Sequence, residues 1–262
     1  MGLLNSSIVY SEEIYGWEFL EFEHFEDVKF MIVGLPDVGL VGAITGMHLI
    51  RSKDMSYTVG IDHYGALPPV VIMNRGRVLH PIRIYRSGDV AALITDVPIL
   101  PAAIPSFSAA VVEYSRRRGI EYIISTTGVG NPKRLEQEKP SLYWLASDKK
   151  ASLLASSLRM ASEPEQGIIV GPYAIILKEA MKKHVHNLVL LADSFIDIPD
   201  PEAAAVIVEG INSITGLNVS VEELIKQAEE IKLRMRDLMK ETKAVMARMG
   251  KEMEYRAPIL YT

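Results

Sequence analysis

Short apolar runs rich in β-branched residues alternate with longer amphipathic stretches along most of the chain, and this alternation limits the fold more than any other feature. It is typical of parallel strands with helices on both faces of the sheet. The segment Asn74-Arg75-Gly76-Arg77 predicts a hairpin turn, so part of the sheet is expected to be antiparallel. We therefore predict an α/β fold with a mixed, mostly parallel sheet. The expected strands cover residues 28–33, 57–61, 70–73, 78–85, 90–95, 120–125, 142–146 and 188–191, and the expected helices cover 102–118, 173–183 and 202–215.

Composition indicates a soluble globular protein whose partners do not include nucleic acid. With 262 residues, of which 48% are hydrophobic, the chain can bury a substantial core. Its formal net charge of -5 provides no basic field for a phosphate backbone. The most apolar stretch, residues 90–112, is interrupted by Asp96 and three prolines, whereas a membrane helix needs about 20 uninterrupted apolar residues. We expect no membrane association, and the absence of cysteine fits a cytoplasmic location.

A heptad pattern near the end of the chain predicts one long helix over residues 220–250. Ser220 and Glu223 have the spacing of a capping box, and apolar residues then recur at alternating steps of three and four. Such a narrow seam packs against another helix, either of a second subunit or of the chain's own core, and the pattern leaves both alternatives open. The residues expected to carry oligomerisation are Leu224, Ile231, Met235, Leu238 and Val245.

The chain is thus predicted to comprise an α/β core over residues 1–219, this helix, and a tail over residues 251–262. Gly250 can end the helix, and Pro258 keeps the following residues from becoming helical. The tail ends in Leu260-Tyr261-Thr262. An apolar side chain, a tyrosine and a terminal carboxylate suit a pocket that offers a lysine or backbone amides. We expect these three residues to dock into a partner.

A glycine-containing loop, Gly34-Leu35-Pro36-Asp37-Val38-Gly39-Leu40-Val41-Gly42, joins an expected strand to an expected helix. Backbone amides at such a place can receive a phosphate, but the spacing fits neither the dinucleotide fingerprint nor a P-loop, and Asp37 would repel an anion. We favour a structural loop in which Gly34, Pro36, Gly39 and Gly42 allow a tight turn and close helix packing. Asp37 is expected to cap the helix.

The alternative function is a small-molecule or nucleotide-binding enzyme that uses the glycine loop, residues 34–42, together with polar residues at the ends of expected strands. They are Asp62, His63, Thr126, Thr127, Asp193 and Ser194. Open α/β sheets bind ligands at such positions, although strand ends also emerge ordinarily into solvent.

Two further groups of residues have the types that bind metals, but both favour structural roles. Asp200 and Glu202 fit the start of a helix, and the spacing of His184 and His186 does not match a zinc motif. We predict no catalytic residue, no metal site and no cofactor.

Three stretches together resemble the proteasome assembly chaperone two family. They are the glycine loop after its apolar strand, Gly171-Pro172-Tyr173 with the helix that follows, and Pro199-Asp200-Pro201-Glu202-Ala203-Ala204 before another helix. The resemblance covers roughly residues 29–231, and the ending of the chain resembles archaeal B-type members. It implies a fold like that of purine nucleoside phosphorylases, with an archaeal origin implied by the long C-terminal helix.

The resemblance also implies a function. Leu260-Tyr261-Thr262 looks like the hydrophobic-tyrosine-any motif with which proteasome activators enter pockets of the 20S proteasome α ring. The Thr262 carboxylate would then pair with a pocket lysine, Tyr261 would contact the gate-forming turn, and Leu260 would fill the apolar entrance. A single tail binds weakly, so we expect a homo-oligomer, with a tetramer favoured. A scaffold that holds unfolded client proteins on its methionine-rich helix is a further hypothesis.

Overall fold

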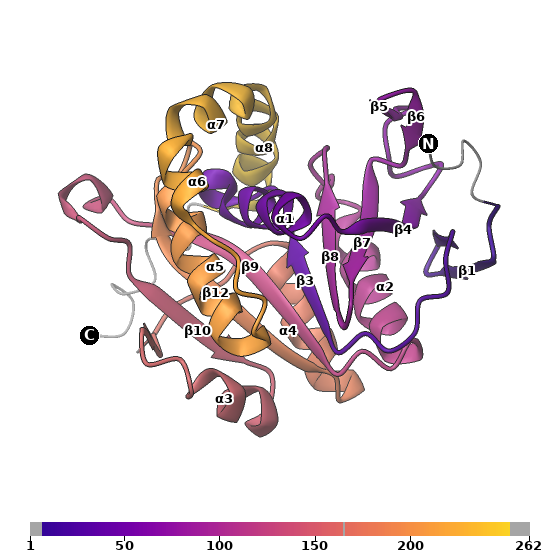
Figure 1. Cartoon of the computed structure of the whole chain (residues 1–262), viewed down its shortest axis with the longest axis horizontal. Helices are drawn as coiled ribbons and strands as arrows, with labels where there is room; N and C mark the ends of the chain where they lie inside the picture. Colours follow the sequence, from indigo (N-terminus) through magenta and orange to yellow (C-terminus); the bar gives the residue numbers. More distant parts are fainter. Residues whose placement is uncertain (1–6, 165, 252–262) are drawn as a thin grey trace.

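The computed structural model describes residues 7–164 and 166–251, which form one large mixed sheet and several helices (Figure 1). The sheet has ten strands in the order β1-β2-β4-β7-β8-β3-β9-β12-β10-β11. The strands are β1 (Tyr10–Ile14), β2 (Trp17–Glu21), β3 (Phe30–Gly34), β4 (Ser56–Asp62), β7 (Ile82–Ser87), β8 (Val90–Thr95), β9 (Tyr122–Gly130), β10 (Leu142–Ala146), β11 (Ala161–Ser162) and β12 (His186–Ser194).

Parallel pairing occupies the centre of this sheet. Strands β8, β3, β9 and β12 run parallel to one another, whereas β1, β2, β4 and β7 pair antiparallel on one side and β10 pairs antiparallel with β12 on the other. The short edge strand β11 pairs parallel with β10. The carboxyl ends of β3, β9 and β12 therefore meet at one edge of the sheet. The predicted mixed α/β fold is confirmed. The sheet is not mostly parallel as predicted, because among the described residues five of its nine strand pairings are antiparallel.

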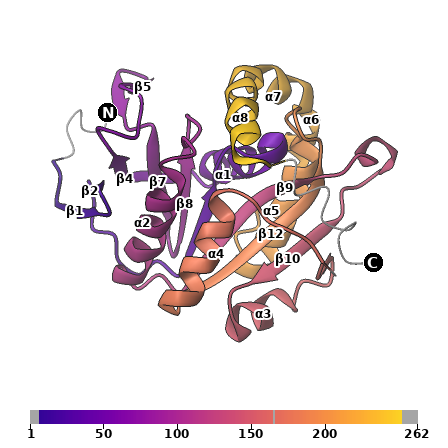
Figure 2. The same cartoon turned by 180° about the vertical axis from the view of Figure 1, so that it is seen from behind.

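Helices cover both faces of the sheet, as two opposite views show (Figures 1 and 2). On one face α1 (Val41–Ser52) and α5 (Pro201–Thr215) pack on β3, β9 and β12, with α3 (Lys149–Ala155) beside β10. On the other face lie α2 (Ile104–Arg117) and α4 (Pro172–Lys183), whose Phe107, Tyr114 and Tyr173 are fully buried. Within residues 7–164 and 166–251, no helix combines the length and apolar character of a membrane span.

The predicted turn at residues 74–77 does join two antiparallel strands, β5 (Ile72–Asn74) and β6 (Arg77–Leu79). This hairpin forms a separate two-stranded sheet instead of part of the main one. The strand expected over residues 78–85 is divided, because β6 ends before His80 and Pro81 and β7 begins after them. Proline lacks the N–H that a continuous ladder requires.

The single helix expected over residues 220–250 is instead three consecutive helices: α6 (Glu222–Lys226), α7 (Ala228–Arg234) and α8 (Arg236–Met249). The backbone departs from helical geometry at Gln227 (φ -101°, ψ 15°) and Met235 (φ -95°, ψ 4°). These bends let the segment arch over α1 and return toward the sheet (Figure 1). Packing on the core thus overrides the straight path that the heptad pattern predicts.

The apolar seam of this segment faces the chain's own core. Leu224, Met235 and Val245 are 2%, 8% and 9% exposed, and Ile231 and Leu238 are partly buried against the same core cluster. Met239 and Met246, which widen the apolar face, are also buried. Of the two packing alternatives, the structure therefore shows the intramolecular one. Met235, Met239 and Met246 are therefore covered by the chain's own core and do not form a surface for unfolded client proteins.

Candidate functional site

The glycine loop between β3 and α1 is packed so closely that side chains would collide with its surroundings. A Cβ atom on Gly34 would lie 2.3 Å from the Gly42 carbonyl oxygen, and one on Gly42 would lie 2.3 Å from the Thr126 carbonyl oxygen. Gly39 has a left-handed backbone (φ 59°), and its Cβ would lie 2.0 Å from Ser194 Oγ. These contacts fit a structural loop that lets β3, β9 and α1 approach one another.

Tyr173, at the start of α4, holds the same loop from the opposite face of the sheet. Its hydroxyl accepts a hydrogen bond from the Leu35 N–H at 2.8 Å and lies 3.3 Å from the Leu35 carbonyl oxygen, to which it can donate. The side chain is fully buried, and burial raises its pKa well above the usual value for tyrosine. The ring therefore acts as a neutral hydrogen-bonding latch. Through this contact the Gly171-Pro172-Tyr173 stretch supports the glycine loop.

Asp37 does not cap the helix as predicted. No helix-capping bond involves its side chain, and its Oδ2 accepts bonds from Thr127 Oγ1 at 3.0 Å and from Lys251 Nζ at 2.7 Å. The side chains of Asp37 and Lys251 are 1% and 4% exposed, so the two charges form a buried ion pair. Removing one partner of such a pair costs about 3–5 kcal/mol, because the other charge is left buried and uncompensated.

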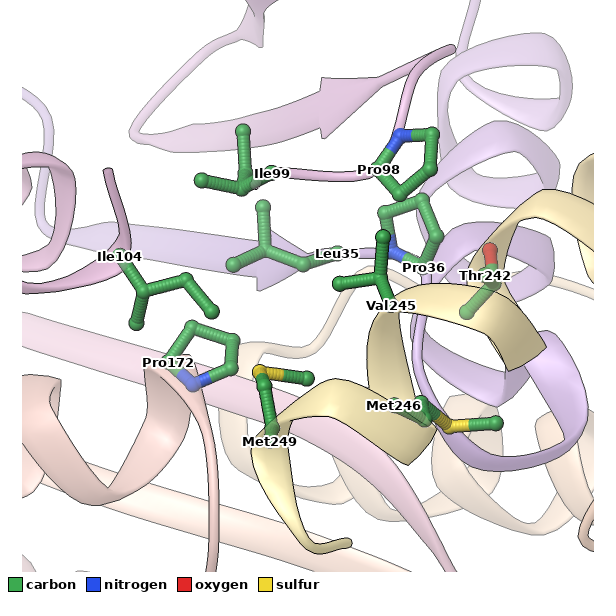
Figure 3. A pocket seen from close by; sticks show the side chains of 10 residues that line it. All are labelled: Leu35, Pro36, Pro98, Ile99, Ile104, Pro172, Thr242, Val245, Met246 and Met249. Carbon is green, nitrogen blue, oxygen red and sulfur yellow. The ribbon is translucent and has the colours of Figure 1, made fainter. Parts of the chain in front are cut away.

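The Asp37–Lys251 ion pair does not favour a phosphate at the loop. The negative Asp37 is buried among the loop residues, and the Lys251 ammonium already pairs with it. Beside the loop lies an apolar cavity of only about 10 Å³ between Leu35, Pro36 and α8, roughly the volume needed for one water (Figure 3). Its other labelled walls include Pro98, Pro172 and Met249. A larger hollow of about 80 Å³ lies along the second half of α1, against α6 and α7.

The residues named for the small-molecule alternative do not line either hollow. Thr126 donates to the Val33 carbonyl oxygen at 3.1 Å, and Asp193 accepts a bond from Gln137 Nε2 at 2.7 Å. Thr126 on β9 and Asp193 on β12 are both buried. Asp62, whose carboxylate accepts from the His63 N–H at 2.7 Å, lies at the end of β4, and three strands separate it from β9. The structure thus places Asp62 and His63 away from the other four residues of this set. Those four, Thr126, Thr127, Asp193 and Ser194, lie on the adjacent strands β9 and β12.

The acidic residues before α5 have structural partners. Asp200 accepts from the Ala203 N–H at 3.0 Å, as the predicted helix start requires, and from Arg134 Nε at 2.9 Å. Arg134 also contacts Glu202 at 2.6 Å and is itself buried. His186 pairs with Asp148 at 3.0 Å, whereas His184 ends α4 in a left-handed conformation. No group of three or more possible ligands that could hold a metal ion occurs in the described part of the chain.

The three residues expected to dock into a partner, Leu260, Tyr261 and Thr262, lie outside the described residues. Sequence reasoning placed Lys251 in the tail because Gly250 signals a helix end. It missed the contact with Asp37, which is 214 positions earlier. No local pattern indicates a pairing over such a separation, although the odd position of an acid inside an apolar glycine loop is a signal that a cation is required.

These features together define one class of α/β protein. The class has a mixed sheet with helices on both faces, a glycine loop held by Tyr173, and C-terminal helices that arch over α1. The model of the PAC2 family matches residues 31–239, and the chain belongs to this family. The predicted family resemblance is therefore confirmed.

Solved structures and a curated relative agree with this assignment. Pyrococcus furiosus PbaA, described as an archaeal homolog of proteasome-assembly chaperone, is 29% identical, with a TM-score of 0.81 over 87% of this chain and 98% of that chain. Pyrococcus furiosus PbaB, described as an archaeal proteasome activator, is 20% identical, with a TM-score of 0.71 over 86% and 99%. An uncharacterized protein of Methanocaldococcus jannaschii is 24% identical over 89% of this chain and 93% of its own length. PbaB, of the B type that the ending of the chain predicts, is thus similar in fold to this chain. PbaA shares more sequence identity with it.

Proposed function

We propose that the chain is an ATP-independent proteasome-binding protein, an activator or assembly chaperone homologue, that docks Leu260-Tyr261-Thr262 into α-ring pockets of the 20S proteasome. The observation that carries the proposal is this hydrophobic-tyrosine-any ending on a chain of the PAC2 family. The descriptions of PbaA and PbaB as a proteasome-assembly chaperone homologue and a proteasome activator support it. The expected place of action is the cytoplasm, and no catalytic step is involved.

The proposed docking needs more than one tail. Three residues bury little surface and bind weakly alone, whereas several tails on one homo-oligomer convert later contacts into intramolecular ones and gain about 10² or more in avidity. A tetramer remains the favoured stoichiometry. Most seam residues pack on the chain's own core, and oligomerisation through Leu224, Ile231, Met235, Leu238 and Val245 stays a prediction. Ile225 and Leu233 on the arch, 55% and 67% exposed, are apolar side chains that remain available.

Docking also requires that Thr262 carry the free carboxylate, which separates this mode from general hydrophobic adhesion. Tyr261→Ala removes the ring, and a variant with two glycines added after Thr262 displaces the carboxylate. We expect both variants to lose most of their binding to 20S particles, measured by surface plasmon resonance. Their thermal unfolding temperatures should equal that of the wild type. Full binding by both variants would contradict the proposal. Hydrolysis of a fluorogenic peptide by the 20S particle, with and without the protein, then distinguishes gate opening from assembly alone.

A further inference from the structure

The end of α8 is closed and turned inward at the last described residue. Gly250 takes a left-handed conformation (φ 68°), and the Lys251 N–H donates to the Met246 carbonyl oxygen at 3.1 Å, as in glycine-terminated helices. This turn carries the Lys251 side chain into the protein, where it is 4% exposed. Its ammonium donates to Asp37 and, at 2.7 Å, to the Val170 carbonyl oxygen. Lys251 therefore ties together the glycine loop, the turn before α4 and the end of α8.

Stability alone does not account for a lysine at this position. Lysine is almost never fully buried unless it is paired, and a buried ion pair is often no more stable than apolar side chains of the same volume. Apolar packing is available here, since Val245, Met246 and Met249 line the adjoining cavity. The ion pair instead contributes positional specificity. The ammonium is satisfied only where it reaches both the Asp37 carboxylate and the Val170 carbonyl oxygen. The pair thus fixes one position for the end of α8.

We propose that Lys251 and Asp37 are positioning residues that anchor the root of the docking tail. This inference rests on the proposed function, because it concerns the eleven residues that follow Lys251, 252–262. With the anchor in place, the tail starts from a fixed point on the glycine loop. The spacing between tail roots in the oligomer is then set by the folded body.

The size of the effect follows from tether length. If the anchor is lost and the helix end frays back to Met246, the length of chain from the last fixed residue to Thr262 grows from eleven to sixteen residues. Effective concentration falls roughly as the −3/2 power of tether length, so each tail beyond the first loses about 1.8-fold. Four tails then lose about fivefold in apparent affinity for the 20S particle.

The test uses the double variant Asp37→Asn with Lys251→Met, which removes both charges and leaves neither one buried alone. Lys243→Met is the matched control, because Lys243 is on the same helix and pairs with Asp197 at 2.6 Å on the surface, away from the tail root. For each full-length protein we would measure the affinity for 20S particles, the oligomer mass by light scattering, and hydrogen exchange by mass spectrometry.

The anchor predicts about fivefold weaker binding by the double variant, with the wild-type oligomer mass and faster exchange confined to residues 246–251. The Lys243→Met control is expected to match the wild type. Wild-type affinity of the double variant would overturn the inference, as would a lost oligomer or faster exchange throughout the chain, which indicate a general structural role. Tyr261→Ala serves as the separate check: if it binds as the wild type does, the proposed function itself fails, whatever the double variant does.

Discussion

Single side chains hold the glycine loop through contacts that are distant in sequence. The glycines are visible in the sequence, and their presence after an apolar strand correctly suggests close backbone approach. The partners that the loop meets are not visible, because Tyr173 is 138 positions from Leu35 and Lys251 is 214 positions from Asp37. For the same reason the sequence wrongly predicts Asp37 as a helix cap: the local pattern indicates a local partner, whereas the folded chain supplies Lys251.

The close approach at Gly42 leads to a direct prediction. Gly42→Ala places a methyl group 2.3 Å from the Thr126 carbonyl oxygen, and neither backbone segment can move without disturbing β9 or α1. We expect a loss of about 1–3 kcal/mol or more in the free energy of unfolding, measured by urea titration. Gly167→Ala is the control, since no atom lies within 4 Å of its added Cβ, and it should stay within about 0.5 kcal/mol of the wild type. Equal stability of the two variants would refute the packing role.

The sequence predicts which segments form helices and strands better than it predicts how these elements pack together. Helices α2, α4 and α5 fall close to where the sequence places them, because each has a proline in its first turn that marks its start. The heptad seam of residues 220–250 also identifies an apolar face correctly. It does not specify what that face meets, since a seam for a neighbouring subunit and a seam for the chain's own core use the same side chains. The bends at Gln227 and Met235 follow from that core contact.

Packing of the arch on its own core is testable at Met246. This side chain is 4% exposed, so Met246→Ala should cost about 2–5 kcal/mol in the free energy of unfolding. Leu233→Ala, at a position 67% exposed on the neighbouring helix, should change it by less than about 0.5 kcal/mol. Urea unfolding at two protein concentrations gives the comparison, and the Met246 loss should be the same at both. A loss that grows on dilution would show that the seam is buried between subunits.

Contacts between α2 and α4 predict a pH dependence. Glu113 on α2 accepts bonds from Arg116 and Arg117 and contacts Lys183 of α4 at 3.1 Å. The hydrogen bond from Arg116, helped by Arg117 and Lys183, lowers the pKa of Glu113 from 4.5 to about 2. Because the folded-state pKa is the lower one, the stabilisation is complete above the unfolded-state pKa and is lost as the pH falls from about 5 toward 2.

Substitution of this carboxylate separates its contribution from general acid effects. Glu113→Gln should lose about 1–3 kcal/mol of unfolding free energy at pH 7, and the difference from the wild type should shrink steadily below pH 4.5. Glu229→Gln, at an exposed position paired with Lys232, is expected to have little effect at either pH. A Glu113→Gln difference that is constant between pH 7 and pH 3 would rule out the ion-pair network as its source.

For the molecule as a whole, the body and the tail have separate tasks in this account. The mixed sheet with helices on both faces followed from the alternation of apolar runs with helical patterns, and the PAC2 match confirms the family. Neither the cavity beside the glycine loop nor the hollow along α1 is lined by the polar strand-end residues of the small-molecule alternative. Its described features instead fix the end of α8 to the glycine loop. The predicted docking residues, by contrast, are a sequence motif that only a partner can test.

Co-sedimentation with 20S proteasome particles tests the central claim most directly. The wild-type protein and a variant that lacks Leu260-Tyr261-Thr262 would be mixed separately with the particle and centrifuged, after thermal unfolding has shown that both bodies are equally stable. The account predicts that the wild type pellets with the particle and that the truncated protein stays in the supernatant. Equal pelleting of the two proteins would contradict it.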